Sequence, residues 1–459
     1  MIPVVTPAEM AAIDDAAPEP VDVLVDRAGR AVARAAIDML GGTYGRVVVV
    51  IAGQGNNGAD GRVAARRLER RGVKVHVIDA ASVGSAVPRC DLVVDAAYGT
   101  GFRGAWRAPS VGDARVLAVD VPSGVDALTG HAGSGVLRAD RTVTFQAMKP
   151  GMLFDAGARL VGEVDVVDIG LDVSSATQHL VEASDVADWW PTRPVDAHKW
   201  AAAVKVIAGS PEMPGAATLC STSASRAGGS LVSLSSPGAD VDTPPEVVQR
   251  HIDAADFADD ALSDIHRFGS LVIGPGLGRD DAVLRAVRDC IADATVPVVV
   301  DGDALFASAW SSDGAGPLLR SRELPTVLTP HDGEFGMLTG AAPGPDRVAS
   351  ARACASDFDC TVLLKGPTTV VASPPSGGSS GIASPVLLVS NGDQRLATAG
   401  TGDVLAGMVA AVLAAGVRPD RAAAAAAWLH ADAAMHRPAD GLVAGDIIDE
   451  LPSRLASLR

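Results

Sequence analysis

The chain is poor in aromatic residues, in lysine and in cysteine. Aromatic side chains make up 3% of its 459 residues, and 38 basic residues face 55 acidic ones, which gives a formal net charge of −17. A surface that stacks nucleic-acid bases needs aromatic side chains, and binding to nucleic acid or to an anionic membrane needs a basic face. The composition therefore argues against both kinds of partner, although it allows a local basic pocket for phosphates.

The cysteines and the apolar runs exclude further classes of protein. The five cysteines are scattered and form no Cys-x-x-Cys pair, so we expect neither a disulfide framework nor a zinc site. The longest apolar stretch, residues 405–417, is shorter than the ~18–20 residues that a membrane span requires. The N-terminal segment has neither the basic nor the apolar region of a secretory signal. These absences predict a soluble cytoplasmic protein.

What the chain does contain is a repeated alternation of strand-like and helix-like segments. Apolar runs rich in Val and Ile alternate with stretches of helical period such as 59–71 and 279–293, which predicts parallel sheets covered on both faces. The expected strands are residues 46–52, 73–78, 91–95, 115–121, 204–208, 270–273, 296–300 and 361–364.

The length allows two or three domains at roughly 100–200 residues each. The proline-containing stretch 184–197 separates two similar openings, one apolar strand that ends in Ala-Gly at Gly53 and another that ends in Ala-Gly at Gly209. We therefore expect two α/β domains, residues 1–187 and 188–459. A low-complexity loop is expected over residues 372–384.

The first strand with this ending leads into the string GQGNNGADG, residues 53–61, which contains a Gly-x-Gly-x-x-Gly pattern. This pattern is typical of a dinucleotide site, and Asp79 stands about 20 residues further on, but a tight turn between strand and helix explains it equally well. A pyrophosphate cradle does not need Asn56, Asn57 and Asp60, because backbone N–H groups suffice. Amide and carboxylate oxygens instead suit a hydroxylated ligand or a hard cation.

Two further strands end in matching polar groups. Asp95 opens the string DAAYGTGFRG, and Asp120 opens the string DVPSGVD, which contains Ser123. Each aspartate alone could simply cap a helix. Because ligands collect at the carboxyl ends of parallel strands, we expect Asn57, Asp95, Asp120 and Ser123 to converge on one crevice.

The three strings, in this order, resemble the epimerase domain of the NAD(P)H-hydrate repair enzymes over most of residues 1–170. The resemblance implies a Rossmann-like three-layer domain that binds hydrated NADH or NADPH. It implies that this substrate is held by Asn56, Asn57, Gly58, Ala59, Asp60 and Asp120, and its phosphate by Gly99, Thr100, Gly101, Phe102, Arg103, Gly104 and Ala105.

The same resemblance implies a K⁺ ion held by Asn57, Asp95 and Ser123. We expect Asp120 to act as the acid/base group, since a carboxylate beside a cation can exchange protons with the hydrated ring. Lys149 also lies in a family-like stretch, but a lysine that extends its head to the surface is an equally good interpretation.

Near the end of the chain, Gly400, Thr401 and Gly402 precede an apolar helical stretch. Their free N–H groups and the helix dipole would form an anion hole. Asp403 could then take a proton from a hydroxyl beside a phosphoryl group, and Lys365 could add positive charge. A Walker A motif is absent from the sequence, because no lysine follows a glycine.

The strings GPGLG, DGDAL, LTPHDGEF, LKGPTT and GTGD resemble the ribokinase-like superfamily and, within it, the ADP-dependent NAD(P)H-hydrate dehydratases, over about residues 195–459. The resemblance implies a ribokinase-like α/β domain that uses ADP and Mg²⁺. It implies substrate contacts from Ala216, Gly276, His331 and Asp403, and an adenine-nucleotide site at Lys365, Gly366, Pro367, Thr368, Thr369 and Gly402. Taken alone, His331 could be a loop histidine and Glu334 a solvent-facing carboxylate.

Together the two resemblances imply a bifunctional enzyme that epimerises the R and S hydrates and dehydrates the S form with ADP, giving AMP and phosphate. We expect a homo-oligomer with small-molecule substrates. Two alternatives stay open: a ribokinase-like small-molecule kinase, which would prefer ATP, and a nucleotide-binding scaffold with one inactive domain. An NAD dehydrogenase would explain the Gly-x-Gly-x-x-Gly pattern but neither Asn56-Asn57 nor the second domain.

Overall fold

The computed structural model describes residues 1–375 and 384–459, which divide into two compact units, Ile2–Gln178 and His179–Arg459 together with Met1. The predicted boundary between residues 187 and 188 lies inside a helix of the second unit, α5 (Ala183–Trp189). Most of the low-complexity stretch 372–384 lies outside the described residues.

The N-terminal unit is built on a six-stranded sheet with the order β3-β2-β4-β5-β6-β7, and all of its strand pairs are parallel. Its strands are β2 (Val47–Ala52), β3 (Lys74–Asp79), β4 (Leu92–Ala96), β5 (Arg115–Val119), β6 (Arg141–Phe145) and β7 (Glu163–Val167). The other elements are β1 (Ile2–Val4), α1 (Pro7–Asp15), α2 (Val21–Leu40), α3 (Asn56–Glu69), η1 (Ala80–Ser82), η2 (Pro150–Met152) and α4 (Gly157–Leu160), and β8 (Gln178–Leu180) follows at the division between the units.

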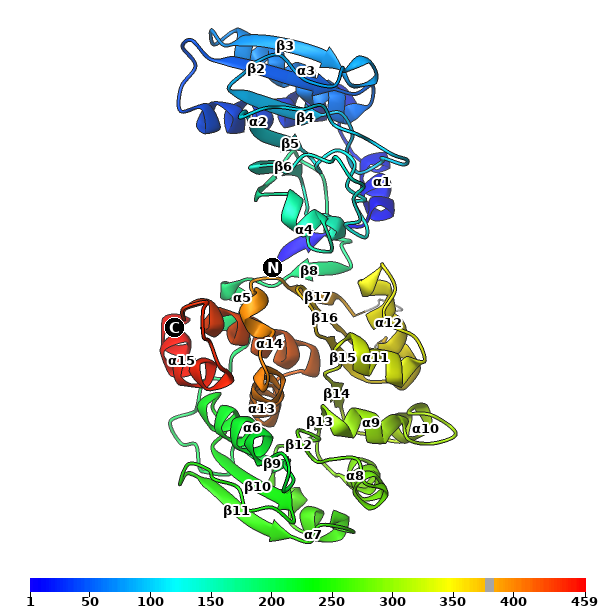
Figure 1. The fold of residues 1–459 in the computed structure, drawn as a ribbon, viewed down its shortest axis with the longest axis vertical. Helices are drawn as coiled ribbons and strands as arrows, with labels where there is room; N and C mark the ends of the chain where they lie inside the picture. Colours follow the sequence, from blue (N-terminus) through cyan, green and yellow to red (C-terminus); the bar gives the residue numbers. More distant parts are fainter. Residues whose placement is uncertain (376–383) are drawn as a thin grey trace. The chain divides into compact units, whose positions relative to one another are not determined.

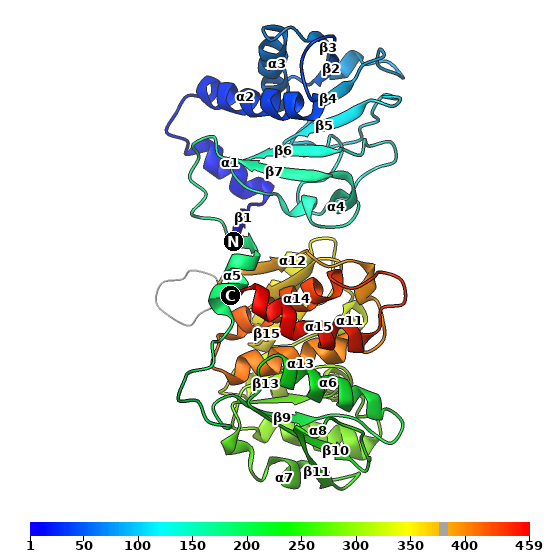
Figure 2. The ribbon, with the colours of Figure 1, turned by 90° about the vertical axis from the view of Figure 1, so that its left-hand side faces the viewer.

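The alternation of side chains along the valine-rich strands forms two cores in this unit. Val48 and Val50 of β2 pack with α2 and α3 on one face of the sheet (Figure 2), while Val49 and Ile51 point to the other. That second face is covered by the segments after β3 and β4, including Ala80 and Trp106, rather than by long helices. The predicted α/β layers are thus present, with a third layer made mainly of loops.

The C-terminal unit contains a longer sheet with the order β17-β16-β15-β14-β13-β12-β9-β10-β11. The pairs from β15 to β11 are parallel, and β16 runs antiparallel to both of its neighbours. The strands are β9 (Ala203–Ile207), β10 (Leu231–Pro237), β11 (Val247–Ile252), β12 (Ser270–Ile273), β13 (Val298–Val300), β14 (Thr326–Leu328), β15 (Thr361–Leu364), β16 (Thr369–Ala372) and β17 (Val386–Val389).

Helices cover both faces of this sheet (Figure 1). One face carries α6 (Pro214–Arg226), α13 (Thr401–Ala414), α14 (Pro419–Met435) and α15 (Ala444–Ser457); the other carries α8 (Asp281–Asp293), α9 (Asp303–Ala309), α10 (Gly316–Arg320), α11 (Asp332–Thr339) and α12 (Arg347–Phe358). The remaining short elements are α7 (Ala258–Leu262), η3 (Ile265–Arg267) and η4 (Gln394–Leu396). The result is the three-layer α/β architecture that the alternating pattern predicts.

Glycine and alanine let the helices of this unit approach closely. A β-carbon on Gly407 of α13 would lie 2.2 Å from the backbone oxygen of Cys220 in α6, so only glycine fits there. In α14, residues Ala422 to Ala426 are fully buried. This packing holds α13, whose first turn carries the Gly-Thr-Gly-Asp motif, in a fixed position. No helix in the described parts of the chain is long and apolar enough to cross a membrane.

Candidate active sites of the two units

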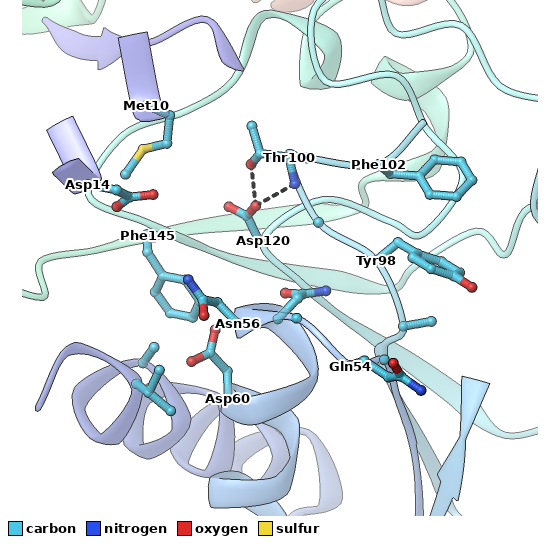
Figure 3. Close-up of a pocket in the computed structure, with 18 of the residues that line it drawn as sticks. Met10, Asp14, Gln54, Asn56, Asp60, Tyr98, Thr100, Phe102, Asp120 and Phe145 are labelled. Carbon is cyan, nitrogen blue, oxygen red and sulfur yellow. Dashed lines mark hydrogen bonds between the residues drawn. The ribbon is translucent and has the colours of Figure 1, made fainter. Parts of the chain in front are cut away.

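A cavity of about 890 Å³ lies at the carboxyl ends of the N-terminal strands (Figure 3). The turns after β2, β3 and β4 line it, together with Asp120 after β5 and with residues of α1 and α2. The strand order is β3-β2-β4, so the chain passes from β2 to β3 on one side and then crosses back to β4 on the other side of β2. Open parallel sheets bind ligands at the place where the strand order reverses in this way, which here lies between β2 and β4. Of the four residues expected to converge on one crevice, Asn57 and Asp120 line this cavity, whereas Asp95 and Ser123 are not among its lining residues.

Asp120 is held at the floor of this cavity by groups from three segments. Its Oδ1 accepts hydrogen bonds from Lys149 Nζ at 2.5 Å and from the Thr144 hydroxyl of β6 at 3.2 Å. Its Oδ2 accepts one of 3.0 Å from the backbone N–H of Thr100 and another from the Thr100 hydroxyl. Burial alone would raise the pKa of Asp120, but the Lys149 ammonium and the Thr100 donors hold it below its ordinary value. The carboxylate is thus held in its ionised form.

The backbone of Asp120 is unusual, because its φ of 67° lies in the left-handed region that non-glycine residues rarely adopt. This conformation ends β5 at Val119, two residues before the end that the apolar pattern predicts. The turn directs the carboxyl group toward the cavity, where Figure 3 shows it beside Thr100. Strain of this kind is often found at functional sites.

Lys149 is buried rather than exposed, so the interpretation as a surface lysine is wrong. Its side chain is 1% exposed, and besides Asp120 its ammonium donates to the Thr144 hydroxyl at 2.8 Å and to the backbone oxygens of Phe145 and Ala147. The short distance in sequence between β6 and Lys149 brings the ammonium back to the strand end. An ammonium with this set of acceptors is a fixed cation of the site.

Asp60 and Asp14 add two carboxyl groups to the same cavity. Asp60, on α3, is 6% exposed, and burial together with the charges of Asp120 and Asp14 raises its pKa to about 8. Burial also raises the pKa of Asp14, on α1. Within residues 1–375 and 384–459, the Asp60 carboxyl has no hydrogen-bond or ion-pair partner.

The residues expected to hold K⁺ include one tight pair and one amide without a partner. The Ser123 hydroxyl donates to Asp95 Oδ1 at 2.6 Å, and the Ser123 N–H donates to Asp95 Oδ2 at 2.9 Å. The amide nitrogen and oxygen of the Asn57 side chain are both buried and, among the described residues, have no hydrogen-bond partner. Asp95 pairs with no cationic side chain in the same residues. Buried oxygens left in this state fit a bound monovalent cation.

The other predicted residues of this site divide into two groups. Those that line the cavity are Asn56, Asn57, Asp60, Gly99, Thr100, Gly101, Phe102, Arg103 and Asp120, whereas Gly58, Ala59, Gly104 and Ala105 are not among its lining residues. Gly58 instead packs behind the turn, where a β-carbon would lie 1.9 Å from the backbone oxygen of Gly53. Met10, Asp14 and Phe145 also line the cavity, and no motif pointed to them.

The second site lies at the N-terminus of α13. Gly400, with a φ of 86°, precedes the helix, and Asp403 lies in its first turn. Burial, with the nearby charge of Asp301, raises the pKa of Asp403 to about 7. A β-carbon built on Gly402 would lie 3.5 Å from Lys365 Nζ, so this lysine from the end of β15 faces the motif, as the sequence predicts. A base and a cation thus stand beside the N-terminal, positive end of the α13 dipole.

Lys365 is held by two carboxylates that the sequence did not assign to a role. Its ammonium lies 3.0 Å from Asp301 Oδ1 and 3.6 Å from Glu334 Oε2. Burial by itself would lower the pKa of Lys365, but Asp301 and Glu334 raise it above its ordinary value. The interpretation of Glu334 as a solvent-facing residue is wrong, because its side chain is buried and also accepts a hydrogen bond from the His331 N–H.

The remaining predicted residues lie on the loops around this cluster. His331 caps α11 through Nδ1, which accepts hydrogen bonds from the N–H groups of Gly333 and Glu334. Ala216 and Gly276 are neighbours, since a β-carbon on Gly276 would meet that of Ala216 at 2.7 Å. Gly366, Pro367, Thr368 and Thr369 connect Lys365 to β16. In the described residues, no group of three His, Cys, Asp or Glu side chains is placed to hold a metal ion.

Comparisons with known proteins agree with both halves of this description. The family described as NAD(P)H-hydrate dehydratase matches residues 204–453, and the family described as YjeF-related protein N-terminus matches residues 21–84 and 79–151. A ribokinase-like superfamily protein from Enterococcus faecalis has the fold of the C-terminal unit, with a TM-score of 0.50 at 20% identity over 61% of this chain and 96% of that one.

Two curated relatives each cover more than nine tenths of the chain. The bifunctional NAD(P)H-hydrate repair enzyme of Moorella thermoacetica is 33% identical over 99% of this chain and 97% of its own length. The enzyme of the same name from Mycobacterium leprae is 37% identical over 92% of this chain and 90% of its own length. With both sites in place and this match along its full length, the chain belongs to the family of bifunctional NAD(P)H-hydrate repair enzymes.

Proposed function

We propose that the chain returns hydrated NADH or NADPH to the active coenzyme in two steps, one in each unit. The N-terminal domain, expected over residues 1–187, interconverts the R and S hydrates. The C-terminal domain, expected over residues 188–459, dehydrates the S hydrate and converts ADP to AMP and phosphate. The observation that carries the proposal is that this member of the family has a candidate acid/base carboxylate and a lysine in each of two separate sites.

In the N-terminal unit, Asp120 would accept a proton from the hydrated ring. Lys149 supports this role, because its ammonium keeps Asp120 ionised until the substrate arrives. Gly99 to Arg103 line the cavity, and the N–H groups of Gly99, Gly101 and Arg103 would hold phosphate, because those of Thr100 and Phe102 donate to Asp120 and to the Gly99 oxygen. Asn57, Asp95 and Ser123 would hold K⁺, which supplies positive charge near the substrate without donating a proton.

In the C-terminal unit, Asp403 would take the proton of the C6 hydroxyl as that oxygen attacks the terminal phosphoryl group of ADP. The N–H groups of Gly400 and Gly402, together with Lys365, would stabilise the charge of the phosphoryl group in transfer, while the Thr401 N–H donates to the Thr398 oxygen. Phosphate is a far better leaving group than hydroxide, so its elimination restores the conjugated ring. Ala216, Gly276 and His331 would contact this substrate, and Lys365 to Thr369 with Gly402 the adenine nucleotide.

Asp301 and Glu334 are the oxygen donors best placed for Mg²⁺. Mg²⁺ usually binds one or two carboxylates together with substrate phosphates rather than a cage of protein ligands. Two carboxylates beside the phosphoryl-binding turn fit that pattern. When bound, Mg²⁺ would neutralise charge on the nucleotide phosphates.

The direct test uses the full-length protein with a mixture of R and S hydrated NADH. With ADP, we expect complete recovery of the reduced-nicotinamide absorbance and release of inorganic phosphate. Without enzymatic epimerisation, only the S hydrate would be converted to NADH, apart from R hydrate that epimerises spontaneously. No recovery with wild-type protein would contradict the proposal, and a stable phosphorylated product would favour the kinase alternative. The cytoplasmic location and the homo-oligomeric state stay predictions, which cell fractionation and light scattering would test.

A further inference from the structure

Asp60 is a buried carboxyl group to which the proposed function gives no chemical role beyond substrate contact. It comes from the first turns of α3, lines the cavity and is 6% exposed. Figure 3 shows it on the opposite side of the cavity from Asp120, and both carboxyl groups point into the same space. In the described residues it has no hydrogen-bond or ion-pair partner, whereas Asp120 has Lys149 and Thr100.

The two carboxylates nearest Asp60 favour its neutral form. Asp14 faces it from α1 and Asp120 from the turn after β5, and the cation of the site, Lys149, is bound to Asp120. Burial and these two carboxylates raise the pKa of Asp60 to about 8, while the pKa of Asp120 is lowered. Two carboxyl groups in one site with pKa values pushed apart are the usual arrangement of a general acid and a general base.

We propose that Asp60 is the proton donor of the epimerisation, with Asp120 as the proton acceptor across the cavity. The inference rests on the proposed function and deepens it. Asp60 gives its proton to the C6 hydroxyl, the C6–O bond breaks and water leaves, while the N1 lone pair forms the C6–N1 double bond. Water then adds to the opposite face of C6 and Asp120 takes its proton, which gives the other epimer.

The same two residues serve the reverse direction with exchanged roles. After one turnover Asp60 is ionised and Asp120 is protonated, so the next molecule of the product epimer finds an acid on the correct face. A proton returned through solvent restores the starting state for another molecule of the first epimer. The mechanism therefore requires the two carboxyl groups to lie on opposite sides of the bound ring, and they come from different elements of the cavity wall, Asp60 from α3 and Asp120 from the turn after β5.

The test measures interconversion of the hydrates by the full chain without ADP, so that the C-terminal unit is idle. Asp60→Asn keeps the size of the side chain and removes the proton donor. We expect its kcat for epimerisation to fall about 10²–10⁴-fold, the usual contribution of a general acid, with KM changed much less. Asp60→Glu should restore part of kcat. The matched control is Asp38→Asn, an exposed aspartate on α2 outside the cavity, which should leave kcat unchanged.

The pH profile separates a catalytic role from a structural one. In the wild type, kcat should fall as the pH rises through about 8, since Asp60 loses its proton there. Asp14→Asn removes one negative neighbour, so this fall should move to lower pH. Thermal unfolding followed by circular dichroism reports whether the N-terminal unit of each variant is folded, since activity on S hydrate with ADP reports on the C-terminal unit alone.

The outcomes are distinct. Wild-type protein that does not interconvert the hydrates overturns the proposed function itself. Wild-type activity that persists undiminished in Asp60→Asn, or a loss confined to KM, overturns only the assignment of Asp60 as proton donor. A wild-type kcat that stays level or rises through pH 8 overturns it as well.

Discussion

Each unit of the chain places a lysine near the carboxyl ends of its parallel strands, but the two lysines bind different carboxylates. Lys149 binds Asp120, the candidate acid/base group of its own site. Lys365 binds Asp301 and Glu334 and leaves Asp403, the candidate base of the second site, without an ion pair in the described residues. The pKa of Asp120 is accordingly lowered and that of Asp403 is raised to about 7.

This difference fits the two kinds of chemistry. An epimerase must both give and take a proton, so one carboxyl group can be kept ionised while another keeps its proton. A phosphoryl transfer needs a base only while the hydroxyl attacks. The lysine of that site can then stabilise the negative charge of the phosphate instead of the base. Pairing the lysine with neighbouring carboxylates positions it for that purpose.

The largest expected effect comes from removing the second base. Asp403→Asn should lower the ADP-dependent dehydration rate about 10²–10⁴-fold and leave the interconversion of R and S hydrates intact. Asp289→Asn, an exposed aspartate on α8, is the matched control. Absorbance recovery with pure S hydrate measures the first activity, and chromatography of the hydrates the second. Undiminished recovery in Asp403→Asn would contradict the assigned mechanism.

The next effect tests the pairing in the N-terminal unit. Lys149→Met leaves Asp120 as a buried charge without its cation and should lower the free energy of unfolding by about 3–5 kcal/mol. Adding Asp120→Asn should recover much of that loss, because no unpaired charge remains. Lys74→Met, at an exposed position of β3, should change stability by less than about 0.5 kcal/mol. Denaturant titration of the full chain measures all three; equal effects of the two lysine variants would show that the pair is not stabilising.

Smaller still is the effect of closing the space behind the first turn. Gly58→Ala places a methyl group 1.9 Å from the Gly53 backbone oxygen, so the turn must shift, at a cost of about 1–3 kcal/mol. Gly55→Ala meets open space and is the control in the same turn. We expect Gly58→Ala to lower the thermal stability and the epimerisation rate but not the dehydration of S hydrate. Similar behaviour of the two variants would mean that the turn adapts freely.

The pH dependence of dehydration sharpens the comparison further. Asp403 works as a base only when ionised, and its folded pKa of about 7 lies above the ordinary value for aspartate. The rate should therefore rise with pH, up to about tenfold per unit below pH 7, and level off above it. Epimerisation should show no such rise near pH 7, since Asp120 is already ionised. Initial rates of dehydration and of epimerisation, measured at saturating substrate on both sides of pH 7, test this expectation. A dehydration rate that does not change across pH 7 would contradict the role of Asp403.

Replacing K⁺ should have the mildest effect. Exchange of K⁺ for Na⁺ should reduce epimerisation more than dehydration, because Asn57, Asp95 and Ser123 belong to the N-terminal unit. In Asn57→Ala, the epimerisation rate should be the same with K⁺ as with Na⁺. Equal responses of the two activities in the wild type would count against a cation at these residues.

Much of the architecture could be predicted from the sequence, because buried parallel strands have near-continuous valine runs. Residues 46–52, 204–208 and 361–364 each correspond to a strand of the structure within one residue at either end. Strand ends were less predictable where one residue changes the backbone, as Asp120 does at the end of β5. The boundary near residue 187 could not be placed from composition, since α5 packs with the second unit through tertiary contacts.

The sites were predictable where their residues follow strands in short motifs. Asp120, Lys365 and Asp403 each stand in a short sequence motif that could be recognised without the fold. The structure places each of them among polar partners or at a helix N-terminus. Asp14 could not be found in this way, because it comes from helix α1, which precedes the sheet, and only the fold brings it to the cavity. Whether Lys149 is buried likewise depends on contacts that span the chain from Asp120 to Ala147.

The left-handed backbone at Asp120 has a consequence for mutagenesis. Asn tolerates that conformation nearly as well as Asp, and Gly tolerates it best, whereas Ala, Val or Glu would add strain. A library of all substitutions at this position would thus mix two kinds of loss, one of chemistry and one of shape. Asn and Gly would report the missing carboxylate alone, and the gap between them and Ala would measure how much the turn itself contributes.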